Sequence, residues 1–204
     1  MTLKGNISKA EHIEWKYIPL IIQKLELDKK YKICLVVAFG CFFGIRLKAV
    51  LSIRWEDILN KESFEIDEKN GTRTIYIIDD IRNLINRIYK KIGSPETESY
   101  VFLNNSGTKV LSSQYVNKQV KVLFTNYEIP YQSLSSDSFL KTFCIKYLES
   151  KEFTQDAKKW ISKKLGHASW SITANFLGYS DDLHDRHNYN SFSMDADFEN
   201  NTDG

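Results

Sequence analysis

The sequence predicts a mainly α-helical domain with one small antiparallel β-hairpin, an α+β fold. Most of the chain places its apolar residues three or four positions apart, the spacing of amphipathic helices. Residues 63–78 change to alternation around Asn70-Gly71, a pair typical of a two-residue hairpin turn. With 204 residues and 42% hydrophobic composition, the chain is long enough for one domain with its own core. We assign residues 1–180 to this domain.

Charge is distributed unevenly along the chain. The formal net charge is +2, but residues 181–204 hold seven acidic side chains and one basic side chain. Residues 1–180 therefore carry 27 basic and 19 acidic side chains, a net charge of +8. A basic body fits a domain that binds a polyanion, although a solvated surface gives the same count. We expect residues 181–204 to form an acidic, flexible tail.

The cysteines and the apolar runs exclude several classes of protein. Cys34, Cys41 and Cys144 lack the spacing of metal ligands, which favours buried thiols in a reducing compartment. No apolar run approaches the roughly 20 residues of a membrane span, and the N-terminus lacks the apolar core of a signal peptide. We therefore expect a cytoplasmic protein with no metal, no organic cofactor and no membrane partner.

Two helices are predicted near the N-terminus. Residues 10–25 show helical spacing, and Pro19 should kink this helix or mark its start. Residues 30–43 are apolar nearly all round, which predicts a buried helix. Asp28 is a candidate N-cap for that second helix.

Gly44 breaks the buried helix, and Arg46 opens the next one. The apolar residues that follow Arg46 recur near helical spacing and can face a core. A glycine beside the arginine allows another backbone or a ligand to come close. Taken alone, Arg46 is most simply a surface arginine after a helix break.

The hairpin and the middle of the chain come next. Lys69 lies at the edge of the predicted turn and, taken alone, is a solvated lysine. Residues 80–92 predict an amphipathic helix, and a short extended piece precedes a helix over about 113–124. That helix carries Lys118 and Lys121 on a polar face, which could lie near DNA but is more commonly just solvated.

Two more helices are predicted toward the C-terminus. Ser135 or Ser136 can cap a helix that runs to Leu148 with core residues at helical spacing. Residues 154–165 form a further helix with a glycine cap, and His167 follows it. A lone histidine in this place is most simply a surface or structural residue.

Three segments of the chain together resemble the tyrosine recombinase (phage integrase) catalytic domain. Residues 44–58 match the first box, G-[IL]-R-x-x-x-[LV]-x-x-[IL]-x-W-x-D-I. Residues 137–143 resemble the second box, H-x-[LF]-R-[HK]-T-F, and residues 165–176 the third, L-G-H-x-x-x-x-x-T-x-x-Y. The resemblance covers about residues 10–180. It implies the tyrosine recombinase catalytic-domain fold, double-stranded DNA as partner, and chemistry that uses no cofactor.

The resemblance also implies roles for particular residues. Arg46 corresponds to the arginine that clamps the scissile phosphate. Lys69 corresponds to the hairpin lysine that acts as general acid on the leaving 5′ oxygen, with Arg73 as a less favoured substitute. His167 corresponds to the histidine that orients the phosphate or the nucleophile.

The chain departs from the family pattern at three catalytic positions. Asp137 stands in place of a histidine, Leu140 in place of the second arginine, and Phe176 in place of the nucleophilic tyrosine. Losing one donor to the transition state typically costs about 100- to 1,000-fold in rate, and losing the nucleophile ends covalent catalysis. Tyr179, three residues after Phe176, is a candidate for a shifted nucleophile.

The leading hypothesis is therefore a catalytically inactive DNA-binding protein of this fold, a repressor or accessory factor of a phage or mobile element. It would act in the bacterial cytoplasm or nucleoid and could self-associate on DNA. The first alternative is an active site-specific recombinase that uses Tyr179, and the second is a helical protein-interaction domain. The candidate DNA contacts are Arg46, Lys69, Arg73, Lys118, Lys121, Lys141, Lys163, Lys164 and His167.

Overall fold

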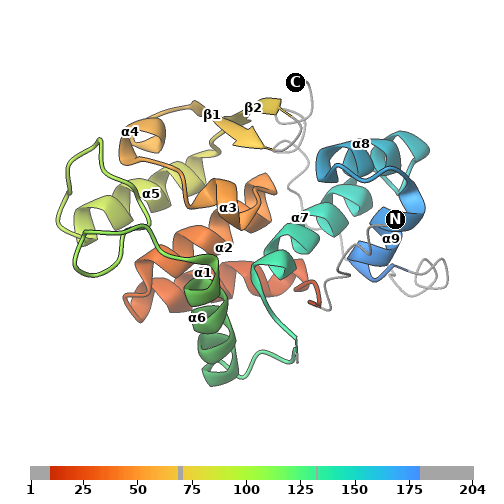
Figure 1. Ribbon diagram of the computed structural model, residues 1–204. Helices are drawn as coiled ribbons and strands as arrows, with labels where there is room; N and C mark the ends of the chain where they lie inside the picture. Colours follow the sequence, from red (N-terminus) through yellow and green to blue (C-terminus); the bar gives the residue numbers. More distant parts are fainter. Residues whose placement is uncertain (1–9, 69–70, 132, 180–204) are drawn as a thin grey trace, which may run out of the picture.

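The computed structural model describes residues 10–68, 71–131 and 133–179. Lys69, a predicted site residue, and the predicted acidic tail of residues 181–204 lie outside the described residues. Within the described part, the fold is mainly helical, and its two-stranded antiparallel sheet lies at one edge of the helices (Figure 1). The predicted fold class is therefore confirmed.

Of the two predicted N-terminal helices, the first begins later than the predicted residue 10, and the second matches its predicted bounds within one residue. A short 3₁₀ helix, Trp15–Tyr17, leads into α1, Ile18–Leu27, and Pro19 lies in the first turn of α1 and so marks its start. The helix α2 covers Tyr31–Phe43. The prediction that Asp28 caps α2 is wrong. Asp28 ends α1, and its carboxylate accepts a 2.7 Å hydrogen bond from the Tyr127 hydroxyl instead.

The helix α2 lies close against α7, Ser136–Ser150 (Figure 1). Two glycines allow this contact, Gly40 within α2 and Gly44 at its C-terminal end. A Cβ placed on Gly40 would lie 2.5 Å from Cβ of Phe139. At Gly44, which ends α2 with a φ of +60°, a Cβ would lie 2.4 Å from the Phe143 ring. These glycines therefore let the two helices approach more closely than any residue with a side chain would allow.

The segment after Gly44 carries two short helices and the hairpin. The helices are α3, Leu47–Val50, and α4, Trp55–Ile58, and the strands are β1, Ser63–Glu68, and β2, Gly71–Tyr76. Glu68 pairs with Gly71, so Gly71 belongs to β2 and not to the turn at Asn70-Gly71 that the sequence predicts. The alternating pattern of β1 buries Phe64 and Ile66 on one face.

The middle of the chain follows the predicted periodicity. The amphipathic helix α5, Asp79–Lys91, buries one apolar stripe, and α6, Ser113–Asn126, starts at Ser112, whose hydroxyl accepts from the Tyr115 amide. Between them, the predicted extended piece makes two isolated bridges, Arg54 to Tyr100 and Leu103 to Val110.

Three helices form the C-terminal part of the described chain. Ser135, one of the two predicted candidates, caps α7. The helix α8, Gln155–Leu165, ends at Gly166 in the left-handed conformation, also as predicted. The eight-residue helix α9, Trp170–Leu177, has no counterpart among the predicted elements, and it lies with α8 beside α7 (Figure 1).

Buried side chains form two clusters that meet along α7. The larger cluster contains α1, α2, the sheet, α5 and α6, and it includes Phe139. The smaller one starts at Leu140 and joins α7 to α8 and α9. Successive residues of α7 thus face different clusters. Among the described residues, no helix has the length and apolar character needed to span a membrane.

Candidate nucleic-acid interface

Arg46 connects the first and third boxes in space. It is the N-cap residue of α3 and is half-buried. Its Nη2 donates a 2.9 Å hydrogen bond to the carbonyl oxygen of Leu165, in the last turn of α8. The guanidinium therefore lies where the start of α3 meets the end of α8, although 119 residues separate the two positions.

Two further cations lie against the carboxylate of Glu68. Arg73 Nε lies 3.3 Å from Glu68 Oε2, and Arg73 Nη2 donates a 3.0 Å hydrogen bond to the carbonyl oxygen of Phe43. Lys164 Nζ lies 3.8 Å from the same Oε2. The side chains of Arg73, Glu68 and Lys164 are 15%, 14% and 5% exposed. We call Arg46, Arg73, Lys164 and Glu68 the charged cluster.

Burial and like charge change the acid-base behaviour of the charged cluster. Desolvation, followed by the positive charge of Arg73, lowers the pKa of Lys164 to about 8, while Glu68 acts in the opposite direction. Arg46 lowers this pKa further, so its charge also reaches Lys164. Desolvation lowers the pKa of Arg73 as well. Burial of this positive charge therefore costs free energy, and a further anion beside the charged cluster would lower that cost.

A chain of hydroxyl groups orients His167. Its Nδ1 lies 3.1 Å from Thr173 Oγ1, which donates to Ser162 Oγ at 2.8 Å, and Ser162 Oγ donates to the carbonyl oxygen of Lys158 at 2.9 Å. The Thr173 hydroxyl also lies 3.3 Å from the carbonyl oxygen of Ser169. These contacts fix the position of the His167 ring beside α8 and α9.

Phe176 lies beside His167, as the spacing of the third box implies. The two ring centroids are 5.5 Å apart in an edge-to-face arrangement. A further neighbour of Phe176 is Lys141, whose Nζ lies 4.8 Å from the centre of its ring. The side chain at position 176 therefore packs against two predicted site residues, His167 and the buried Lys141.

Tyr179 packs in the smaller core cluster. Its ring stacks on Phe153 with centroids 5.3 Å apart, and it meets Trp170 edge-on at 6.0 Å. It follows Gly178, the left-handed C-cap of α9. These contacts hold the ring among aromatic side chains.

The second box has a structural explanation at each position that departs from the pattern. Asp137 lies in the first turn of α7, where a carboxylate interacts favourably with the helix dipole, and it also acts on Lys141 one turn later. Leu140 is 2% exposed and belongs to the smaller core cluster. Both replacements are therefore compatible with the helix that carries them.

The remaining candidate lysines divide into buried and exposed groups. Lys141 is 2% exposed, and its Nζ donates a 2.6 Å hydrogen bond to the carbonyl oxygen of Ala10. Its contacts are those of a residue that fixes the N-terminal segment to α7, so we leave it out of the proposed DNA contacts. Lys118, Lys121 and Lys163 are exposed.

Glu68 belongs to the site but was not predicted from the sequence. Alternation along β1 places Glu68 on the same face as Phe64 and Ile66, which are buried. A carboxylate on the apolar face of a strand needs a partner, and this signal was available in the sequence. The hydroxyls of Ser162 and Thr173 were also missed, because serine and threonine give no comparable signal.

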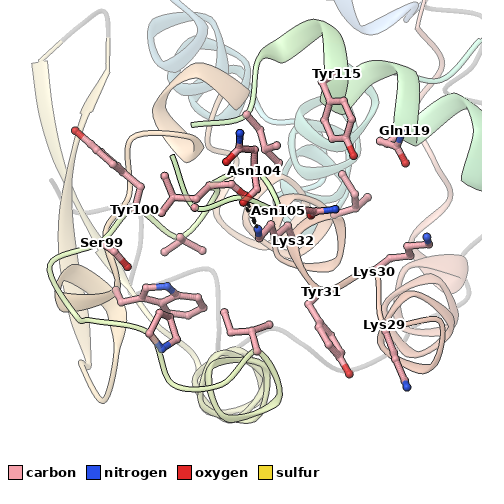
Figure 2. Close-up of a pocket in the computed structure, with 18 residues that line it drawn as sticks. Lys29, Lys30, Tyr31, Lys32, Ser99, Tyr100, Asn104, Asn105, Tyr115 and Gln119 are labelled. Carbon is pink, nitrogen blue, oxygen red and sulfur yellow. Dashed lines mark hydrogen bonds between the residues drawn. The ribbon is translucent and has the colours of Figure 1, made fainter. Parts of the chain in front are cut away.

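A separate pocket of about 540 Å³ lies at the N-terminal end of α2 (Figure 2). Tyrosine rings and lysines line it, and Lys32 donates a hydrogen bond there to the carbonyl oxygen of Leu103. Figure 2 shows Tyr115 and Gln119 of α6 on one side of this pocket. None of its described lining residues is a predicted site residue.

Within residues 10–68, 71–131 and 133–179, no group of three or more histidine, cysteine, aspartate or glutamate side chains could hold a metal ion.

The solved structures most useful for comparison are recombinases. XerA recombinase superposes with a TM-score of 0.65 and 14% identity, over 88% of this chain and 66% of XerA. XerH site-specific recombinase bound to palindromic difH substrate gives 0.64 and 17%, over 91% and 55%. A lambda integrase dimer bound to a COC′ core site gives 0.56 and 13%, over 94% and 53%. This chain thus spans between about half and two thirds of these proteins, and at such identities the likeness concerns the fold.

Sequence comparison identifies the family. No curated protein sequence matches the chain. The model of the Phage integrase family, however, matches residues 13–181, which is most of the chain and includes all three boxes. The chain therefore belongs to the phage integrase family, and its fold is that of a tyrosine recombinase catalytic domain.

Proposed function

We propose that this chain binds double-stranded DNA without cleaving it, as a repressor or accessory factor of a phage or other mobile element. The observation that carries the proposal is the packing of Leu140 and Phe176 at the positions where the family has its second arginine and its nucleophilic tyrosine. Both side chains pack in the smaller core cluster. A leucine gives no charge to a phosphate, and a phenylalanine has no oxygen to attack one.

The cations that remain support DNA binding. Arg73 and Lys164 share Glu68, and Arg46 bonds to the carbonyl oxygen of Leu165, the residue after Lys164. Lys118, Lys121 and Lys163 are exposed. Contacts of lysine and arginine with phosphates supply affinity whether or not a strand is cut. XerH and lambda integrase, which share the fold, are described in complex with DNA, and lambda integrase as a dimer. We extend both properties, DNA binding and self-association on DNA, to this chain as part of the proposal.

The test uses DNA fragments from the source genome, incubated with the protein over a series of salt concentrations. Each sample is divided between a native gel and a denaturing gel. We expect a native shift that weakens as salt rises, because each phosphate contact releases counterions. We expect no protein–DNA adduct to survive the denaturant. Sequencing of the shifted fragments would then identify the DNA site.

An active recombinase remains the first alternative, with Tyr179 as shifted nucleophile. It requires the Tyr179 ring to leave its stack with Phe153 and Trp170. A denaturant-resistant adduct that disappears in Tyr179→Phe would establish this alternative and contradict our proposal.

A protein-interaction domain is the second alternative, and the pocket of Figure 2 favours it. Tyrosines such as Tyr31, Tyr100 and Tyr115 line this concave surface, and tyrosine is enriched at protein interfaces. On this hypothesis the protein would bind another protein with little dependence on salt and would give no native shift with DNA at any salt concentration.

A further inference from the structure

The charged cluster contains more positive than negative charge among the described residues. Arg46 precedes α3, Arg73 lies on β2 and Lys164 lies in the last turn of α8, while Glu68 is the carboxylate they share. Glu68 Oε2 lies 3.3 Å from Arg73 Nε and 3.8 Å from Lys164 Nζ. One carboxylate thus serves cations from two separate elements, and Arg46 adds a third positive charge nearby.

Burial makes this imbalance costly. The Lys164 side chain is 5% exposed, and the side chain of Arg73 is 15% exposed. A buried cation is stable only when oxygen atoms or negative charges replace the water that it has lost. Arg73 Nη1 is buried and has no hydrogen-bond partner among the described residues. The cluster therefore has both the charge and a donor for one more anion.

The position of Lys164 relates this excess of positive charge to the second box. On α7, Leu140 occupies the place that the family pattern gives to an arginine, and Phe143 follows one turn later. The Lys164 Nζ lies 5.3 Å from the centre of the Phe143 ring. Lys164 thus brings a positive charge from α8 to the same region of α7 that lost one at Leu140.

We propose that Arg73 and Lys164 complete, with Arg46, a site for one DNA phosphate, and that Glu68 holds the place of this phosphate until DNA binds. The inference rests on the proposed function, because it concerns how the same cluster binds DNA. A carboxylate resembles a phosphodiester in carrying one negative charge on two oxygens that a guanidinium can bind. DNA must therefore displace Glu68, and the carboxylate weakens DNA binding by competing for the same cations.

Glu68→Gln tests the competition, and Glu65→Gln is its matched control. Both changes remove one negative charge from β1, but Glu65 is exposed and pairs across the sheet with Thr74. We expect Glu68→Gln to lower the dissociation constant for DNA about tenfold, the effect of removing one close charge pair. We expect Glu65→Gln to change it less than threefold.

Lys164→Met tests the contribution of the lysine, and Lys159→Met is its control on the same helix. Lys159 is exposed and pairs with Asp156 at 3.7 Å. We expect Lys164→Met to raise the dissociation constant about tenfold, Lys164→Arg to restore most of the loss, and Lys159→Met to have little effect. Circular dichroism and thermal unfolding of each variant show whether it is folded.

The outcomes separate this inference from the proposed function. If the wild type binds DNA but Glu68→Gln behaves like Glu65→Gln, or Lys164→Met like Lys159→Met, Glu68 does not hold the phosphate site and the inference is wrong. If neither the wild type nor Glu68→Gln binds at any salt concentration, the proposed function fails and the inference fails with it. Inorganic phosphate is titrated separately. Saturation of Glu68→Gln at micromolar phosphate, without tighter DNA binding, would assign the cluster to a small anion and overturn its role with DNA.

Discussion

Gly44 lies against the ring of Phe143, so closely that a Cβ on the glycine would be 2.4 Å from Cδ1 of the ring. The first box of the family pattern thus contacts the second through a glycine rather than through a side chain. Gly44 also has a φ of +60°, which L residues adopt at a cost. The positive φ and the close approach of Phe143 therefore both disfavour a side chain at position 44.

Gly44→Ala should lower the free energy of unfolding by about 2–4 kcal/mol, the sum of the backbone strain and the overlap with Phe143. Gly107→Ala is the matched control, because Gly107 has a φ of +70° but open space around its Cα. We expect the control to lose about 1 kcal/mol. Urea unfolding followed by circular dichroism measures both. Equal losses in the two variants would show that the approach to Phe143 costs nothing.

Thr142→Val should also destabilise the protein, by about 1–3 kcal/mol, because it leaves a buried amide without its acceptor. Thr142 Oγ1 accepts from the Ile13 amide at 2.9 Å and lies 3.1 Å from the carbonyl oxygen of Ile13. Valine preserves the shape of the side chain. The control is Thr125→Val, since the Thr125 hydroxyl is exposed and bonds within α6 to the Lys121 carbonyl. A loss in the control as large as that in Thr142→Val would contradict the explanation.

Lys164→Met should raise the thermal stability of the DNA-free protein near pH 7, although we expect the same change to weaken DNA binding. The folded-state pKa of Lys164 is about 8, below its ordinary value of 10.5, so the folded protein disfavours the charged form. Below pH 8 this lysine is charged in both states and the full cost of burying the charge is present, about 1–3 kcal/mol. Between pH 8 and 10.5 the unfolded chain binds more protons, so this cost disappears as pH rises.

Thermal melting at pH 7 and pH 9.5 checks this prediction. The advantage of Lys164→Met over the wild type should be large at pH 7 and small at pH 9.5. Glu68, Arg73, Arg46 and Cys144 are the ionisable groups that act on Lys164. The comparison therefore requires that none of them changes its charge between pH 7 and pH 9.5. Burial raises the pKa of Cys144 to about 12, which keeps its thiol protonated at both pH values. A variant that is less stable at pH 7 would contradict the prediction.

Phe176→Tyr alone should not produce a covalent protein–DNA adduct. The new hydroxyl would extend from a half-buried ring beside His167, and the fold should tolerate it with a loss of about 1 kcal/mol or less. The second arginine would still be missing at Leu140, and loss of one such donor costs about 100- to 1,000-fold in rate. A denaturing gel with labelled DNA is the measurement. A strong adduct band would show that the rest of the site is functional.

The three cysteines should resist thiol reagents in the native protein. All three are buried, and desolvation raises the pKa of Cys34 and of Cys144 to about 12 and that of Cys41 well above its ordinary value. We expect no reaction with Ellman's reagent in buffer and reaction of three thiols per chain in guanidinium chloride. Fast release of chromophore from the native protein would contradict this prediction.

The elements that sequence analysis predicted correctly are those determined by local signals. The helical spacing of residues 80–92, the alternation around the hairpin and the cap at Ser135 each depend on neighbours within a few positions. Helix α9 was missed because its eight residues are too few to show a clear apolar stripe. Asp28 was misassigned because the deciding partner, Tyr127, lies 99 residues away.

The candidate site was predictable only as far as the family pattern reaches. That pattern led to Arg46, His167 and position 176, and the structure places Phe176 beside His167. It could not show that Glu68 meets Lys164, because the two residues belong to elements far apart in the sequence. Nor could it show that Lys141 is buried, since a lysine within a helix gives no signal of a partner such as the Ala10 carbonyl.

The buried helix α2 has a consequence for how the protein unfolds. Nearly all its side chains are inaccessible to water, so it has no solvated face on which it could remain stable alone. It packs on α7, and α7 contributes to both core clusters. Loss of the smaller cluster would expose the part of α2 that packs against Phe143 of α7. Loss of the larger cluster would leave α7 without α2 to pack on. The two clusters should therefore melt together, in one cooperative transition without a half-folded intermediate.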